Sequence, residues 1–241
     1  MADFNWLELI PAVTYYGDKP GEVATHVATM GAAGIFLCAA AIVGRAALGQ
    51  GESAITPASR FSIKGFFEGL TEFIIGLSET VMGERGLKYA PLFAPIFFFI
   101  LINNLVGLLP GMTPATEKMS TTLALGLFSF FVFHYYGIKE NGVSYIKHFT
   151  VLPLKPAFLI LIPLMLLIEL ISSLLRPFTL GLRLQANMMG DHMVLSTFYD
   201  LIPWLVPVFV YVIGVFVCFM QAFIFTLLSI IYVAMATAHD H

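Results

Sequence analysis

Long uncharged stretches alternate with short polar ones along this chain. Five of the apolar stretches are long enough to cross the ~30 Å hydrocarbon layer of a membrane as helices, at ~1.5 Å per residue. The last two exceed that length, so we expect them to be long, tilted helices. The pattern predicts an all-α polytopic membrane protein whose five membrane-embedded helices cover residues 23–44, 89–109, 119–138, 156–197 and 201–236.

Residues 58–84 carry a different pattern. Arg60, Lys64, Glu68 and Glu72 recur every four residues, and aromatic and aliphatic side chains occupy the opposite face. This spacing predicts one amphipathic helix, which we expect to lie on the cytoplasmic surface of the membrane. The alternative is a helix within the loop that packs on the bundle.

Basic residues are concentrated in two of the connections, 45–88 and 139–155. Positively charged loops stay on the cytoplasmic side of a membrane. We therefore expect residues 1–22 to be an outside N-terminal tail and the C-terminus to be cytoplasmic. Residues 23–241 are predicted to form a single membrane domain. The N-terminus lacks the basic region of a secretory signal peptide, so no cleaved signal is expected.

Composition agrees with a membrane protein and excludes several functions. Hydrophobic residues make up 59% of the chain and charged residues 11%, whereas soluble domains have about 25% charged residues. A net charge of −3 without a basic cluster argues against a nucleic-acid partner. Cys38 and Cys218 lie in separate apolar stretches and are expected to be packing residues. The sequence has no HExxH, cysteine cluster or phosphate-binding loop, so neither a metal nor a cofactor is expected.

Arg183 is the most informative residue, because the stretch from 157 to 190 holds only two other charges, Glu169 and Arg176. An arginine at membrane depth costs ~2.5–3.5 kcal/mol or more, so it is kept where it has a task. At about 100° per residue, several polar residues share its side of the helix. They are Glu169, Ser172, Ser173, Arg176, Asn187 and Asp191. A stripe this narrow is expected to face protein or water rather than lipid.

The stripe also has structural interpretations. The charges that could neutralise Arg183 within its own helix are Glu169 and Asp191, but they lie roughly 21 and 12 Å away along the axis, too far for a direct pair. Arg176 is expected to be an interfacial arginine that reaches toward the headgroups, with a channel role as the alternative.

Glu169, together with Ser172 and Ser173, is a candidate for a wet path on the cytoplasmic side of Arg183. The alternative is a structural carboxylate that satisfies hydrogen bonds within the bundle.

On the other side of Arg183, Asn187 can orient water, and Asp191 and His192 can exchange protons near neutral pH. His192 lies about 180° from the stripe, so it can face a neighbouring helix, and its channel role is left open. Gln221 is the one strongly polar side chain in the middle of the last stretch. It is either a buried, satisfied glutamine or a channel-lining residue.

The remaining histidines lack partners at metal-ligand spacing. His26, His134 and His148 lie near the ends of apolar stretches and are predicted to be interfacial or surface residues. His239 and His241 are too few to form a metal site.

The run LLRPFTLGLRLQAN, from Leu174 to Asn187, resembles the signature of subunit a of F-type ATP synthases. Three further features match in order. They are NLVGLLP from Asn104 to Pro110 followed by TPAT, Glu169 before the arginine, and QAFIFTLL from Gln221 to Leu228. The match spans about residues 90–235, and the first 85 residues match only in layout.

The resemblance implies a stator subunit pressed against a rotating ring of c subunits. Ions would enter through one aqueous half-channel, ride on a ring carboxylate and leave through another, with Arg183 separating the two paths. The chain would be a non-catalytic, proton-translocating part of a complex with peripheral-stalk b subunits and a soluble ATPase sector. We expect it in the lipid bilayer of a bacterial inner membrane, with an organellar inner membrane as the alternative, and moving H⁺ rather than Na⁺.

The chain departs from the family pattern at two positions. Members commonly carry an ionisable side chain where this chain has Gly214, and a small residue where it has Asp191. On antiparallel helices with Arg183 and Gln221 at similar depth, these two positions would lie at nearly one level. We therefore predict that Asp191 is the outer relay and that Gly214 makes room for it.

Two other functions compete with this interpretation. A secondary transporter with a midplane polar site is expected to show internal repeats and paired Gly/Pro-broken helices, which this sequence lacks. An intramembrane hydrolase needs a serine–histidine pair or two carboxylates at one depth, and no such pair is evident.

Overall fold

The structure is a computed structural model that describes residues 22–47, 63–109, 112, 114–142, 162–201 and 206–237. All regular structure in these ranges is helical. The helices are α2 (Glu22–Ala47), α3 (Ile63–Met82), η3 (Gly83–Arg85), α4 (Gly86–Gly107), η4 (Ala115–Glu117), α5 (Met119–Asn141), α7 (Ile162–Leu201) and α8 (Val206–Thr237). The predicted all-α class is confirmed.

The expected spans 23–44 and 119–138 lie within α2 and α5, and 89–109 follows α4 to two residues beyond its end. The described parts of 156–197 and 201–236 fall on α7 and α8, except that residue 201 ends α7, and residues 156–161 and 202–205 lie outside the description. Within the described residues, four helical runs are long and apolar enough to cross a membrane: His26–Arg45, Gly65–Gly107, Met119–Asn141 and Phe209–Thr237. Helix α7, which carries the charged stripe, is not among these four. At 40 residues it is nevertheless long enough to span a bilayer when tilted.

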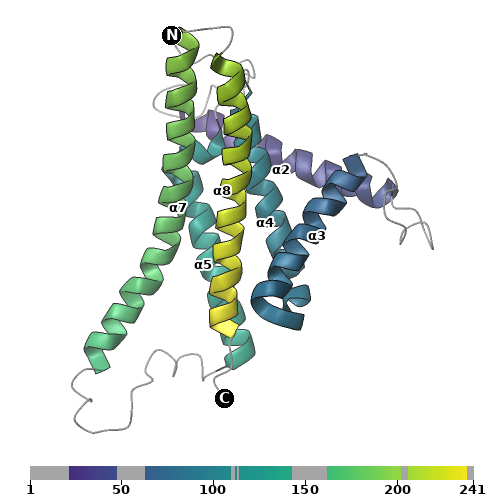
Figure 1. Cartoon of the computed structure of the whole chain (residues 1–241). Helices are drawn as coiled ribbons and strands as arrows, with labels where there is room; N and C mark the ends of the chain where they lie inside the picture. The colour runs from purple at the N-terminus through teal and green to yellow at the C-terminus, as the bar shows by residue number, and fades with distance from the viewer. Residues whose placement is uncertain are drawn as a thin grey trace.

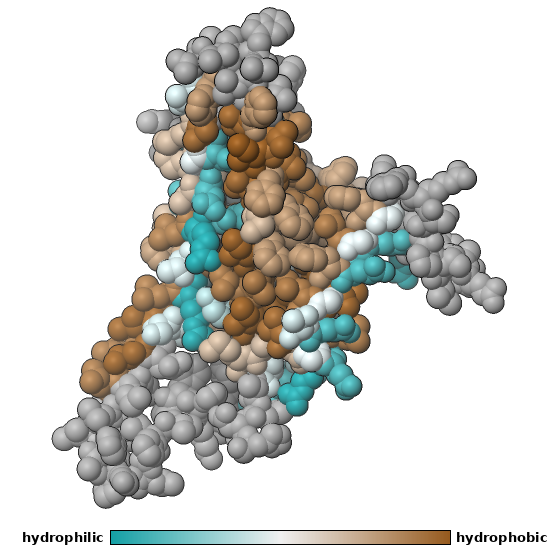
Figure 2. Space-filling view, viewed as in Figure 1, coloured by the Kyte–Doolittle hydropathy of each residue, from teal (hydrophilic) through white to brown (hydrophobic). Residues whose placement is uncertain are grey.

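In Figure 1, α7 and α8 run side by side at the upper end, where α7 finishes and α8 begins, and they diverge toward the lower end. Helix α5 packs against both, α4 lies behind α8, and α2 crosses α4 obliquely. In the rest of the text, "upper" and "lower" refer to the orientation of Figure 1. Most of the visible surface beside these helices is hydrophobic (Figure 2), as expected for a chain that faces lipid or partner subunits.

The core is centred on α4, which is uncharged from residue 89 to residue 109. Its Phe93, Phe97 and Ile100 side chains are fully buried. On α8, Ile230 is fully buried and Phe225 is nearly so. An apolar helix without a polar face suits a position surrounded by other helices. Helix α8 is therefore held firmly on its α4 side, which leaves its opposite side to form the site.

Helix α3 packs on the bundle through its apolar face. Ile74 is fully buried, the Phe67 ring lies 5.3 Å from that of Phe98 on α4, and Phe73 packs against Phe219 and Phe223 on α8. Figure 2 shows a hydrophilic band along the outside of α3. The predicted amphipathic helix is thus packed on α4 and α8, and its position at a membrane surface stays a prediction. Residues 58–62 of that prediction lie outside the description.

The lower end of α8 is held by side chains from two other elements. Asn141 of α5 donates a 2.9 Å hydrogen bond from Nδ2 to the carbonyl of Ala236, and Arg85 of η3 donates from Nη1 to the carbonyl of Thr237 at 3.4 Å. The last carbonyls of a helix lack partners within it, so these two donors stabilise the end of α8.

Helices α5 and α7 approach closely where both carry glycine. A Cβ on Gly126 would lie 2.3 Å from the carbonyl oxygen of Pro177, and a Cβ on Gly181 would lie 2.9 Å from that of Thr122. Only glycine permits such an approach between two backbones. The two contacts also define an antiparallel register. Four residues toward the C-terminus of α5, from 122 to 126, correspond to four residues toward the N-terminus of α7, from 181 to 177.

Candidate functional site

The predicted polar stripe forms a hydrophilic column along α7, beside α8, on a surface that is otherwise largely hydrophobic (Figure 2). Arg183, Asn187 and Ser172 are exposed, Arg176 and Asp191 are partly exposed, and Ser173 is buried. The side chain of Glu169 lies outside the description. The helical spacing therefore gathers these residues on one side of α7, although they do not share one environment.

Arg183 is exposed near the middle of this column. Among the side chains that the structure describes, none forms a hydrogen bond or an ion pair with its guanidinium. Arginine stays protonated at physiological pH. The site thus presents a positive charge on the surface of α7, available to an anionic group from outside the chain.

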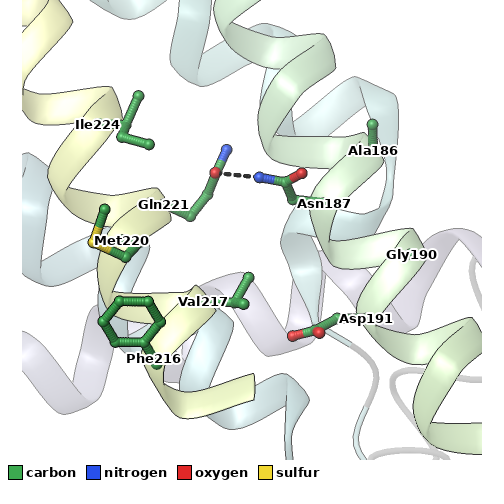
Figure 3. A pocket seen from close by; sticks show the side chains of 9 residues that line it. All are labelled: Ala186, Asn187, Gly190, Asp191, Phe216, Val217, Met220, Gln221 and Ile224. Carbon is green, nitrogen blue, oxygen red and sulfur yellow. Dashed lines mark hydrogen bonds between the residues drawn. The ribbon is translucent and has the colours of Figure 1, made fainter. Parts of the chain in front are cut away.

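Gln221 lies one turn above Arg183, across the α7–α8 interface. Its side chain is only 2% exposed, and its Oε1 accepts a hydrogen bond from Nδ2 of Asn187 (Figure 3). An amide pair of this kind fixes the depth of one helix against the other. Arg183 and Gln221 were expected at similar depth, whereas this bond places Gln221 level with Asn187, one turn above the arginine.

An open cavity of about 410 Å³ lies beside this amide pair, between α7 and α8, and extends to Asp191 (Figure 3). Its polar groups are Asn187, Asp191 and Gln221, and the remaining lining is apolar. A volume of this size holds several water molecules, and three polar side chains can bind them. The cavity therefore offers a wet region within an apolar helix pair.

Asp191 reaches from this cavity toward Gly214 of α8. Its Oδ2 atom is buried and has no hydrogen-bond partner in the described part of the chain. A Cβ on Gly214 would lie 3.4 Å from this oxygen and 2.8 Å from Cδ2 of Leu108. The predicted adjacency of positions 191 and 214 is confirmed. A buried carboxylate oxygen without a partner is costly, so its retention favours a task over a packing role.

His192 faces away from the column, as its angular position predicted. Its Nε2 lies 2.8 Å from the carbonyl oxygen of Gly107 at the end of α4, and its Nδ1 lies 3.7 Å from Oε2 of Glu117 in η4. Sequence periodicity did not single out Glu117, because it comes from a different element. The TPAT motif directly before it was the available signal.

Below Arg183, the column turns toward α5. The Ser173 hydroxyl lies 3.3 Å from Nε2 of His134, and the Arg176 guanidinium lies over the Tyr232 ring of α8, 5.4 Å from its centre. His134 is partly buried between α5 and α7, so it is not a free surface residue, and its position at a membrane interface stays a prediction. Neither interpretation of Arg176 is decided by its contact with Tyr232.

Within the described residues, no group of three or more His, Cys, Asp or Glu side chains could hold a metal ion. Cys218 is a buried free thiol beside Leu108 and Met188, and Cys38 is an exposed one. Both cysteines lie in helices, α2 and α8.

These features define a class of protein: an all-helical membrane bundle in which one long helix carries an arginine between two polar regions, with no partner among the described side chains. The family model for the ATP synthase A chain matches residues 27–234, and this chain belongs to that family. It is 53% identical over 239 residues, 99% of both chains, to ATP synthase subunit a of Bdellovibrio bacteriovorus.

Two further relatives carry the same description. ATP synthase subunit a of Sulfurihydrogenibium sp. is 42% identical over 73% of this chain and 83% of its own. ATP synthase subunit a 2 of Syntrophotalea carbinolica is 35% identical over 99% of this chain and 98% of its own. The family resemblance seen in the sequence motifs is confirmed.

Proposed function

We propose that this chain is the stator subunit a in the membrane sector of an F-type ATP synthase. In this role it forms two ion half-channels against a rotating c-ring and couples proton translocation to ATP synthesis. The observation that carries the proposal is Arg183, which is exposed on α7 and has no described partner. The family match supports it.

Arg183 acts as a fixed positive charge. It attracts an ionised ring carboxylate that arrives opposite α7, and this attraction is strong in a low-dielectric setting. Because guanidinium does not give up its proton, it cannot carry protons itself. It therefore blocks a direct leak between the polar regions above and below it.

The upper region forms the outer half-channel. Water enters the cavity between α7 and α8, and Asp191 exchanges protons between this water and the ring carboxylate. The amide pair of Asn187 and Gln221 holds water beside Arg183. His192, placed against Gly107 and Glu117, borders this path on the α4 side.

The lower region forms the cytoplasmic half-channel. Glu169 and the exposed hydroxyl of Ser172 border a wet exit path, and Ser173 lines its α5 side. Arg176, over the Tyr232 ring, adds a positive charge that keeps an approaching carboxylate ionised.

The chain functions within a complex. Its partners are the c-ring, peripheral-stalk b subunits and the soluble ATPase sector, and the ATP chemistry takes place in that sector. We place the complex in a bacterial inner membrane, with the N-terminus outside, the C-terminus cytoplasmic, and α3 at the cytoplasmic surface. Proton transport is favoured over sodium transport.

Copurification combined with one substitution tests this proposal. The tagged chain is expected to bring down a ring of small two-helix subunits and a soluble ATPase. Arg183→Ala should leave this complex assembled but unable to pump protons in inverted vesicles. Arg45→Ala, which removes an exposed arginine from the end of α2, is the charge-matched control and should pump normally. Normal pumping by the Arg183 variant would overturn the proposal.

A further inference from the structure

We propose that His134 of α5 is a proton-relay residue of the lower half-channel and acts together with Glu169 of α7. This inference rests on the proposed function. It adds a residue of α5 to a path whose other residues lie on α7. It assigns to α5 a part in moving the proton, beyond its part in packing.

The first support is the environment of His134. Its Nε2 lies 3.3 Å from the hydroxyl of Ser173, which is itself only 4% exposed. The imidazole also meets the Phe130 ring edge to face, 4.3 Å between centres. The side chain is therefore held at the α5–α7 contact, where it borders the polar column.

The second support is the register of α5 and α7. Thr122 meets Gly181, and Gly126 meets Pro177. Two further steps of four residues down α5 lead to position 134, and the same two steps back along α7 lead to position 169. The backbone register thus brings position 169 to the level of His134.

The charged and titratable groups near His134 come from two neighbouring helices, α7 and α8. On α7, backbone position 169 lies at the level of His134 by register, and Arg176 acts electrostatically on the imidazole. On α8, Tyr232 lies under Arg176 and 5.9 Å from the ring of Phe133, next to His134.

A histidine in this setting can do what its neighbours cannot. Histidine titrates near pH ~6.5, whereas Arg176 stays charged and a serine hydroxyl does not titrate near neutral pH. In the step we propose, the O–H bond of protonated Glu169 breaks and an N–H bond forms on neutral His134. The imidazolium then releases the proton from its other nitrogen to water at the lower end, and the imidazole is neutral again.

The test measures proton pumping against pH, from about 5.5 to 8.5, by assembled complexes in inverted vesicles. His134→Gln keeps an amide that can bind Ser173 but does not titrate. We expect normal assembly, a rate lower by about tenfold, and loss of the contribution that the imidazole makes to the pH profile. Tenfold is less than the ~10²–10⁴-fold of a general acid or base in chemistry, because water can also carry the proton.

Rates are expressed per assembled complex, so a folding defect does not hide the result, and His134→Asn provides a second non-titrating variant. His26→Gln on α2 is the matched control and should leave rate and pH profile unchanged. Wild-type rates and pH profiles in both His134 variants would overturn the relay. If Arg183→Ala abolishes pumping in the same vesicles while the His134 variants pump normally, only this inference fails. If Arg183→Ala pumps normally, the proposed function fails as well.

Discussion

The polar column on α7 has two halves that are walled by different helices. Above Arg183 it faces α8, where Asn187 bonds Gln221 and an open cavity reaches Asp191. Below Arg183 it turns to α5, where Ser173 meets His134. One helix therefore lines two separate polar regions, and a substitution in one wall is expected to damage one region only.

The contacts with α5 and α8 differ on the two sides of Arg183, although Arg176 below it still lies over the Tyr232 ring of α8. Gly181, two residues below, still lies against the backbone of Thr122 on α5, whereas Asn187, four residues above, already bonds α8. Figure 1 shows α7 and α8 diverging toward the lower end of the bundle. The arginine thus stands where neither neighbouring helix covers it.

The largest effect is expected from Arg183, because it belongs to both halves. Arg183→Ala should abolish coupled ATP synthesis in inverted vesicles while the complex remains assembled. Arg183→Lys should fail or nearly fail, because a compact ammonium does not reproduce the planar guanidinium fork. Synthesis at wild-type rates in either variant would contradict the role given to the arginine.

A steric change in the lower wall comes next. Gly126→Ala places a methyl group against the Pro177 carbonyl, where 2.3 Å leaves no room, and overpacking typically costs ~1–3 kcal/mol. We expect much less assembled complex in membranes, measured by native electrophoresis. Gly34→Ala on α2, where a Cβ meets nothing within 4 Å, is the matched control and should assemble normally. Equal assembly of the two variants would mean that α5 and α7 do not pack as described.

Substitutions in the upper wall test whether Asp191 and Gly214 share one space. Asp191→Gly should reduce proton-driven synthesis strongly, and Gly214→His should reduce it by crowding Leu108 and Asp191. The double variant should recover much of the activity, because the histidine then occupies the space that the carboxylate has left. Such non-additivity is expected only for sites that touch. If the double variant is no more active than the less active single variant, Asp191 is not the relay.

The smallest effect is expected from Glu169→Gln in the lower half. If Glu169 exchanges protons with water, the substitution removes a titratable group that glutamine cannot supply. Glutamine can replace many of the hydrogen bonds of a carboxylate. Proton pumping should slow more than assembly declines. Poor assembly with a normal rate per remaining complex would identify Glu169 as a structural carboxylate.

The helices and the polar column of α7 could be predicted from the sequence. The helices follow from long apolar stretches, and the α7 column follows from helical periodicity. Helix α7 runs on to Leu201, past the expected end near residue 197, because no proline or glycine lies between residue 197 and Pro203.

Contacts between helices were harder to predict. Glu117 and His134 reach the site from other elements, and their positions depend on close approaches such as that of Gly126 to Pro177. Periodicity along one helix holds no information on these approaches. The pairing of Asp191 with Gly214 was predictable only because the family motifs supplied the relative depth of two helices.

The central claim is that Arg183 separates two water-filled paths open to opposite sides of the membrane. Single cysteines at Asn187 and Ser172, both exposed and on either side of Arg183, test it in a background with Cys38→Ala and Cys218→Ala. A membrane-impermeant thiol reagent should label Asn187→Cys only from the outer side and Ser172→Cys only from the cytoplasmic side. Labelling of both cysteines from the same side would contradict the claim.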